Sequence, residues 1–166
     1  MKKIFPDVID GFKISMPRLT LPEIEQLLPH RFPFLFVDEI EDYELGVQIT
    51  GRKQFSGNDF FLRHLGGFVP ETILIEAAAQ VGALLILKDP AYSEKIPYFM
   101  SVEGMTFHRR VRVGETVHFV ETIERMRGAF GILSGRGWVG EELVAEATMR
   151  VALADRASVR TSLSPI

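Results

Sequence analysis

The chain has 166 residues, of which 46% are hydrophobic and 25% charged, and its formal net charge is −3. This balance predicts one soluble domain with a substantial core, and it gives no general attraction to nucleic acid or to an anionic membrane. The chain has no cysteine, which excludes disulfides, thiolate metal sites and a cysteine nucleophile. No apolar run is long enough for a signal peptide or a membrane span, so we expect a cytoplasmic protein.

The first predicted element is a short helix that begins after Thr20. Thr20 and Glu23 have the spacing of a capping box, and Pro22 suits the first helical turn. We expect this helix to end near Pro29, and residues 1–19 to form an extended arm that precedes the domain.

Two strand-like runs follow, at residues 35–43 and 46–55. The most apolar segment comes next and predicts a long helix over about 71–88, with a proline just before it and Asp89-Pro90 at its end. Two polar side chains interrupt its apolar interior, Glu76 and Gln80. They are one turn apart and therefore share a helix face.

Beyond Pro97 the hydrophobic period changes to two, as in strands with one buried face. The alternation covers three segments, and glycine-containing turns separate them: 117–119, 130–138 and 143–153. A long apolar helix between an early strand pair and three or four late strands predicts an α+β domain over residues 20–154. In such a domain an antiparallel sheet curls around one buried helix. The tail, 155–166, has little pattern.

His64 and Glu76 are the candidate catalytic residues, although each has an ordinary alternative. Glu76 can be a structural or solvated carboxylate, and His64 a loop histidine without a role. Together, a histidine can remove a proton next to a carbonyl while a carboxylic acid in apolar surroundings donates one. Gly66-Gly67 and the first amides of the long helix can hold the developing oxyanion. This set suits the elimination of water from a 3-hydroxyacyl thioester.

Other sites are weaker candidates. The chain lacks a serine nucleophile elbow, a phosphate-binding loop and a dinucleotide fingerprint. His108 and His118 have no accompanying acidic or cysteine cluster, so we predict no metal and no cofactor. The basic run that contains Arg109, Arg110 and Arg112 is either a solvated strand face or a surface for an acidic partner.

Two stretches resemble a known family. Leu28-Pro-His-Arg-Phe-Pro-Phe-Leu-Phe-Val-Asp38 resembles the N-terminal signature of the 3-hydroxyacyl-[acyl-carrier-protein] dehydratases of fatty-acid synthesis. Phe60-Phe-Leu-Arg-His64 and Leu74-Ile-Glu-Ala-Ala-Ala-Gln-Val-Gly82 are similar to the family's histidine loop and central helix. A weaker likeness covers residues 107–115. Together the matches extend over roughly residues 21–153.

The resemblance implies a hotdog fold, an antiparallel β-sheet wrapped around one long central α-helix. It further implies a homodimer, which can assemble into a hexamer as a trimer of dimers. In that dimer His64 of one subunit removes the C2 proton, and Glu76 of the other assists departure of the 3-hydroxyl. The substrate is bound to acyl carrier protein or to coenzyme A, and no metal or cofactor takes part. Arg109, Arg110 and Arg112 then become candidate docking charges for the acidic carrier protein.

The resemblance also assigns substrate contacts to Gly66, Gly67, Pro70 and Glu71 around the helix start, and to Gln80 one turn beyond the acid. The loop departs from the family's pattern: it is two residues shorter, and Glu71 replaces a glycine. Two other functions therefore stay open. One is an acyl thioesterase in which Glu76 or Glu71 activates water, and the other is a non-catalytic acyl-binding subunit.

Overall fold

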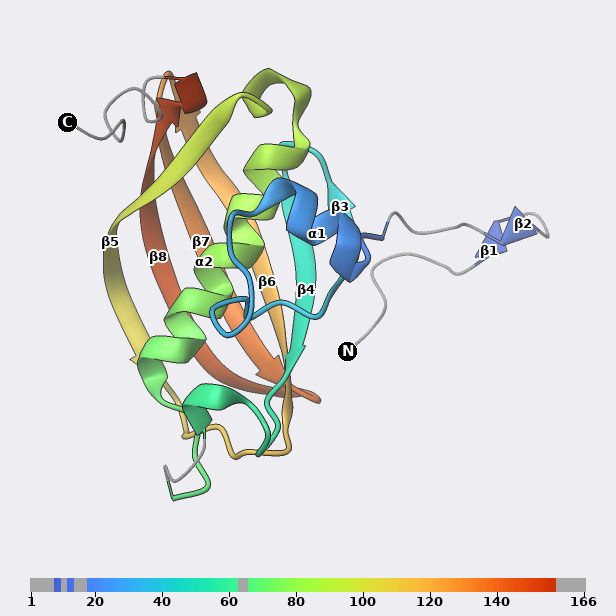
Figure 1. Cartoon of the computed structure of the whole chain (residues 1–166), viewed down its shortest axis with the longest axis vertical. Helices are drawn as coiled ribbons and strands as arrows, with labels where there is room; N and C mark the ends of the chain where they lie inside the picture. Colours follow the sequence, from blue (N-terminus) through green and yellow to red (C-terminus); the bar gives the residue numbers. More distant parts are fainter. Residues whose placement is uncertain (1–7, 10–11, 14–17, 63–65, 158–166) are drawn as a thin grey trace.

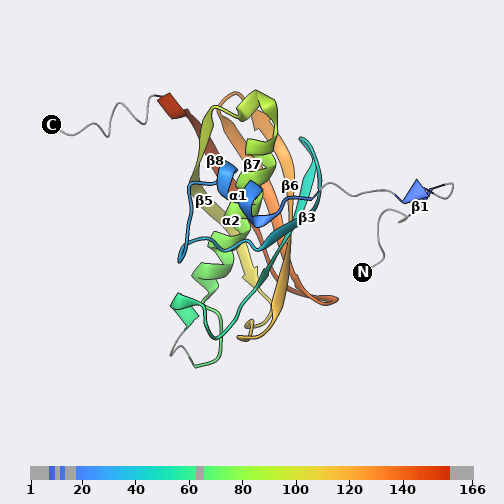
Figure 2. The same cartoon turned by 45° about the vertical axis from the view of Figure 1, so that its right-hand side comes forward.

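A six-stranded antiparallel sheet curves around one long helix, α2 (Glu71–Lys88), as Figure 1 shows. The structure is a computed structural model that describes residues 8–9, 12–13, 18–62 and 66–157. The strands of the sheet are β3 (Glu39–Glu44), β4 (Gln48–Gln54), β5 (Lys95–Phe107), β6 (Thr116–Arg127), β7 (Phe130–Val139) and β8 (Glu142–Asp155). The turned view of Figure 2 shows that α2 crosses the concave face of the sheet. The predicted α+β class and hotdog arrangement are confirmed.

Helix α2 has the bounds that the sequence predicts. Pro70 precedes it, Glu71 is the acidic residue of its first turn, and Lys88 is the basic residue of its last turn. These charges match the helix macrodipole, and alanines in the middle favour the helical backbone. Nearly every residue of its second half is buried against the sheet: Gln80, Val81, Gly82, Leu84, Leu85, Ile86 and Leu87.

The strand order is β3-β4-β6-β7-β8-β5, with every neighbouring pair antiparallel. The three late strands β6, β7 and β8 therefore form the predicted meander in chain order. β5 follows α2 directly but pairs with β8, so it forms one edge of the sheet, and β3 forms the other. The predicted turns after β6 and β7 are confirmed, and Gly128 and Gly140 adopt positive φ there.

Helix α1 (Leu21–Leu27) begins with the predicted capping box. The Glu23 carboxylate accepts hydrogen bonds from both the amide and the hydroxyl of Thr20. The helix ends at Leu27, as expected from the following Pro29. Short elements complete the described chain: β1 (Val8–Ile9), β2 (Phe12–Lys13), η1 (Phe60–Leu62) and η2 (Pro90–Tyr92).

The first predicted strand begins later than residue 35. Strand β3 begins at Glu39, and the amide of Phe36 donates to the side chain of Gln80 on α2 and not to a neighbouring strand. Asp38 ends this segment: its carboxylate accepts from Lys53 at 2.9 Å and from the amide of Gln54 at 2.8 Å. The segment 28–38 is therefore a connection tied to the central helix and to β4, and only its end enters the sheet.

Within the part of the chain that the structure describes, no helix is both long and apolar enough to cross a membrane.

Candidate active site

Glu76 lies in the second turn of α2 with one carboxylate oxygen engaged. Its Oε1 accepts a hydrogen bond of 2.7 Å from Nε2 of Gln80, the residue one helical turn later. Nε2 of His30 lies 3.5 Å from the same oxygen. Among the described residues, the polar contacts of this carboxyl group all reach Oε1. The predicted common face of Glu76 and Gln80 is therefore confirmed, and the two side chains are joined there by a hydrogen bond, with His30 beside them.

Gln80 is 2% exposed and joins the helix to the loop before β3. Its Nε2 donates to the carbonyl of Phe34 at 2.8 Å as well as to Glu76, and its Oε1 accepts from the amide of Phe36 at 2.8 Å. Both amide hydrogens are thus used, as a buried carboxamide requires. The sequence assigned Gln80 to substrate contact, and the structure gives this side chain a role in placing Glu76 and the loop.

The loop that carries His30 is fixed by the arginine beside it. The Arg31 guanidinium folds back and donates to the carbonyls of Glu25, Leu28 and His30 at 2.7–2.9 Å. These are carbonyls at and just beyond the end of α1, which a helix leaves without partners of its own. Arg31 therefore holds the loop through three hydrogen bonds in which the His30 ring takes no part.

A cavity of about 190 Å³ opens beside Glu76, between α2 and the strands β5, β7 and β8. Its polar lining comes from His30, Glu76 and Gln80, and the other lining residues are small or apolar: Ala79, Gly82, Ala83, Pro97, Tyr98, Phe99, Leu133, Met149 and Val151. A cavity with a few polar side chains and a mainly apolar lining suits a ligand with one reactive polar end and an apolar tail.

His64 lies outside the described residues, as do its neighbours 63 and 65. On the near side, η1 ends at Leu62, and on the far side Gly66 and Gly67 have positive φ values of 68° and 80°. The carbonyl of Gly67 accepts from the amide of Val113, and the amide of Val69 donates to Val111. Residues 67–69 are therefore held against 111–113, next to the start of α2.

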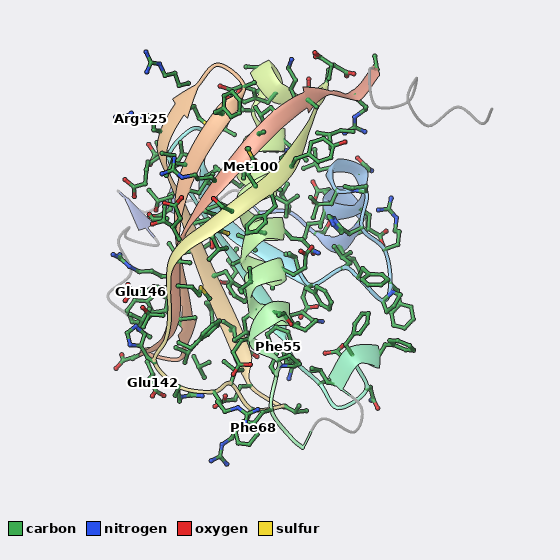
Figure 3. All side chains as sticks on the ribbon, turned by 90° about the vertical axis from the view of Figure 1, so that its left-hand side faces the viewer. Phe55, Phe68, Met100, Arg125, Glu142 and Glu146 are labelled. Atoms are coloured by element: carbon green, nitrogen blue, oxygen red, sulfur yellow. The ribbon has the colours of Figure 1, made fainter. Side chains whose placement is uncertain are left out.

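The helix start and the basic run lie together. Nε of Arg110 is 3.8 Å from the Glu71 carboxylate, and the guanidinium of Arg110 stacks on the Phe68 ring at 4.2 Å. Arg112 lies 5.8 Å from the same ring. Phe68 lies at the end of the molecule that holds the first turn of α2, as Figure 3 shows. Pro70 precedes this turn, and its carbonyl accepts the first helical hydrogen bonds.

Arg109 differs from the other two arginines of the run. It donates to Glu142 at 2.7 Å and to Glu115 at 2.9 Å. Its hydrogen bond to Glu115 is the main reason that the pKa of Glu115 lies below its usual range. The charge of Arg109 is therefore paired with carboxylates of the same chain, whereas the guanidinium groups of Arg110 and Arg112 lie beside the Phe68 ring.

A second carboxyl group, Glu121 of β6, is fully buried on the concave face of the sheet. Neither of its oxygens has a hydrogen-bond partner in the described chain, and burial raises its pKa well above the usual range. Space for the group comes from Gly135, its cross-strand partner on β7, because a Cβ atom there would collide with the carboxyl oxygens.

Sequence reasoning assigned no role to His30 or to Glu121. His30 belongs to the segment that resembles the dehydratase signature, so the likeness itself marked the position, but only the fold brings it to Glu76. Glu121 was missed because it occupies an inward position of an alternating strand, where an apolar residue is expected. No group of three His, Asp or Glu side chains that could hold a metal occurs among the described residues.

Comparison with known proteins agrees with this geometry. The FabA-like domain family model matches residues 28–148. The 3-hydroxyacyl-[acyl-carrier-protein] dehydratase FabZ of Desulforamulus reducens is 40% identical over 141 residues, which cover 83% of this chain and 99% of the relative. FabZ of Thermomicrobium roseum is 38% identical, with 84% and 96% of the two chains covered.

Solved structures with the same fold are more distant in sequence. The dehydratase heterocomplex ApeI:P from Xenorhabdus doucetiae matches with a TM-score of 0.71 at 11% identity, covering 86% of this chain and 97% of the other. A hot-dog-like protein from Thermanaerovibrio acidaminovorans matches with a TM-score of 0.59 at 18% identity, covering 73% and 90%. The match over residues 28–148 and the identity to the FabZ relatives show that this chain belongs to the FabA-like dehydratase family.

Proposed function

We propose that this protein removes water from 3-hydroxyacyl thioesters to give 2-enoyl thioesters, with Glu76 as general acid and His64 as general base. The observation that carries the proposal is the placement of Glu76. Its carboxyl group is held through Oε1 beside a largely apolar cavity, and among the described residues none makes a hydrogen bond to Oε2. The relatives with which this chain aligns over nearly their whole length are 3-hydroxyacyl-[acyl-carrier-protein] dehydratases.

The reaction needs two proton transfers. His64 takes the proton from C2, the electron pair of that bond forms the C2–C3 double bond, and the C3–O bond breaks. The departing hydroxyl takes the proton of Glu76 and leaves as water, so that Glu76 ends as a carboxylate and His64 as an imidazolium. Transfer of the proton from His64 back to Glu76 through solvent restores the starting state.

Negative charge on the thioester carbonyl is stabilised by the first amides of α2, in this proposal. The first turn of a helix has unpaired N–H groups and a partial positive charge, which suit an oxyanion. The Glu71 carboxylate opposes such a charge, but Arg110 lies 3.8 Å from it and offsets it. The replacement of the family's glycine by Glu71 is therefore accompanied by a nearby cation.

The base is supplied by a second subunit, and β5 is the strand proposed to form the dimer. It is an edge strand of 13 residues, and its middle exposes three large apolar side chains in succession: Tyr98, Phe99 and Met100. Figure 3 shows Met100 on this outer strand. A long apolar edge is prone to pair with another chain. Pairing of two β5 strands joins the two sheets, and further assembly of such dimers gives the hexamer.

Acyl carrier protein is the proposed donor of the substrate, in cytoplasmic fatty-acid or related lipid synthesis. Arg110 and Arg112 are the docking charges that this proposal favours, because they flank Phe68 at the end of the molecule where α2 begins. Arg109 contributes less, because its side chain is 28% exposed and hydrogen-bonded to two carboxylates, whereas Arg110 is 60% exposed and lies 3.8 Å from the one carboxylate of Glu71.

The test is conversion of a (3R)-hydroxyacyl thioester to the enoyl thioester, followed by ultraviolet absorbance. We expect His64→Ala to lose at least about 100-fold in kcat/KM, and His118→Ala, a histidine on β6 paired with Glu41, to retain activity. Release of free thiol without enoyl product would instead favour the thioesterase, and binding without turnover the acyl-binding subunit.

Mixing two inactive variants tests the shared site. His64→Ala and Glu76→Ala subunits, denatured together and refolded, form mixed dimers in which one of the two sites has both residues intact. Recovery of about a quarter of the parent activity is the statistical expectation for random pairing of subunits. No recovery from a correctly assembled mixture would place both residues in the same subunit.

A further inference from the structure

His30 lies beside Glu76, although the two proton transfers described above do not use it. Its Nε2 is 3.5 Å from Oε1 of Glu76, and the side chain lines the same cavity. Its other ring nitrogen, Nδ1, is buried without a hydrogen-bond partner in the described chain. Nε2 of the ring is thus directed toward Glu76, and Nδ1 is buried among protein atoms.

This environment selects one tautomer of the neutral ring. Nδ1 lacks a partner in the described chain in either tautomer, so the contact of Nε2 decides between them. With the hydrogen on Nδ1, the lone pair of Nε2 would face the lone pairs of the Glu76 oxygen. With the hydrogen on Nε2, the ring donates toward Oε1. The geometry therefore favours His30 as a second donor to the oxygen that Gln80 already contacts.

We infer that His30 is a positioning residue that fixes which oxygen of Glu76 carries the transferable proton. The inference rests on the proposed function of Glu76 as the acid. With donors from Gln80 and His30 directed at Oε1, that oxygen acts as an acceptor, and the acidic hydrogen resides on Oε2. Oε2 is the oxygen on which no described residue places a hydrogen bond.

The same contact assists the step in which the C3–O bond breaks. When Oε2 gives its proton to the leaving hydroxyl, Glu76 gains a full negative charge, and the Nε2–H of His30 can close on Oε1. Hydrogen bonds at active sites are commonly long before the substrate is bound and tighten toward the transition state, and bonds to charged groups are the stronger ones. No proton leaves His30, so the balance of the reaction is unchanged.

A purely structural role for the ring is less well supported. The loop around it is held by the Arg31 guanidinium on three carbonyls, and by Gln80 on the backbone of Phe34 and Phe36. The His30 side chain is 35% exposed, and among the described residues its one polar side-chain contact is the approach to Glu76.

The test compares two variants on two substrates. His30→Phe keeps an aromatic ring but removes the donor, whereas His30→Gln keeps an N–H donor at a similar reach. His118→Phe is the matched control, because His118 also pairs with a glutamate and has a similar exposure of 32%, but lies on β6 and not at the cavity. The substrates are a 3-hydroxyacyl thioester and the corresponding 3-chloroacyl thioester, whose chloride leaves without needing a proton.

On the 3-hydroxyacyl substrate, we expect His30→Phe to lower kcat about 10- to 100-fold with little change in KM, because a hydrogen bond to a developing charge is lost. His30→Gln should recover most of this loss. On the 3-chloro substrate, His30→Phe should retain the parent rate, because the step that Glu76 assists is absent.

Equal losses of His30→Phe on both substrates, or no loss on either, would overturn the inference. Failure of the proposed function gives a different pattern, since the parent protein itself would then not convert the 3-hydroxyacyl substrate.

Discussion

Two glutamates lie between the central helix and the sheet, Glu76 on the helix with a side chain 44% exposed and Glu121 on the sheet fully buried. Glu76 accepts a hydrogen bond from Gln80 at Oε1, has His30 3.5 Å from the same oxygen, and has a cavity beside it. Glu121 has no partner in the described chain, no exposed surface, and a glycine on the neighbouring strand that leaves room for its carboxyl group. Gly82 lines the same cavity as Glu76, and a Cβ atom at Gly82 would lie 3.7 Å from a carboxyl oxygen of Glu121.

The comparison shows that burial of a carboxyl group does not by itself make it suitable for catalysis. A carboxyl group that exchanges protons with a substrate needs access to it and partners that stabilise the charged form, and Glu76 has both. Burial raises the pKa of Glu121 well above its usual range, which alone would mark it as a candidate acid. Its sealed position instead predicts a residue that stays protonated and affects stability more than turnover.

The largest expected effect is on catalysis at Glu76. Glu76→Gln keeps the size and the contact with Gln80 but removes the transferable proton, so we expect kcat to fall about 1,000-fold, within the usual range for a general acid. The unfolding transition should move little, because the side chain is near the protein surface. Enoyl formation and urea denaturation together measure the two effects.

Glu121 supplies the matched control for that experiment. Glu121→Met should retain the parent kcat, because no substrate reaches a sealed group. If Glu121→Met lost activity as strongly as Glu76→Gln while remaining folded, the division between the two glutamates would be wrong.

A smaller effect is expected when the support of Glu76 is removed. Gln80→Met leaves the buried amide of Phe36 and the carbonyl of Phe34 without their partners. Unpaired buried groups cost about 1–3 kcal/mol each, so we expect a loss of about 3 kcal/mol in the free energy of unfolding, with a fall in kcat. Urea denaturation measures it, and Gln26→Met on the exposed face of α1 is the control.

The pH dependence of stability provides the third prediction. The pKa of Glu121 is raised in the folded state, so the folded protein keeps this proton where the unfolded chain has lost it. The free energy of unfolding therefore falls as pH increases above the ordinary glutamate value of about 4.3, by up to about 1.4 kcal/mol per pH unit until the raised pKa is reached. Below that ordinary value the penalty is absent.

Glu121→Met removes this contribution. We expect the variant to exceed the parent by about 2 kcal/mol at pH 8 and by much less at pH 4.5, since an uncompensated buried ionisable group is replaced by an apolar one of similar length. Denaturation at the two pH values measures the difference. An equal advantage at both would show that packing, and not the proton, is responsible.

The sequence predicted the elements that depend on local patterns. The capping box of Thr20 and Glu23, the bounds of α2 and the turns at Gly128 and Gly140 all follow from short-range chemistry, and the structure confirms them. The position of β5 at the sheet edge did not follow, because strand order depends on long-range pairing that alternation does not encode.

The same division holds for the site. Glu76 and Gln80 could be placed on one face because they are a turn apart on a helix. The approach of His30 to Glu76 joins segments 46 positions apart and requires the fold. The pairing of His64 with Glu76 stays a prediction, since His64 lies outside the described residues.

The smallest expected effect tests the space around Glu121. A methyl group at Gly135 would meet the Glu121 carboxyl oxygens, while the extended backbone there suits alanine. We expect Gly135→Ala to cost about 1 kcal/mol in the parent, because the carboxyl group must move within a closed core. In a Glu121→Ala background the methyl group enters vacated space, so the same change should be neutral or stabilising. A double-mutant cycle from urea denaturation gives the coupling directly. A coupling near zero would mean that the glycine is not there to accommodate the buried acid.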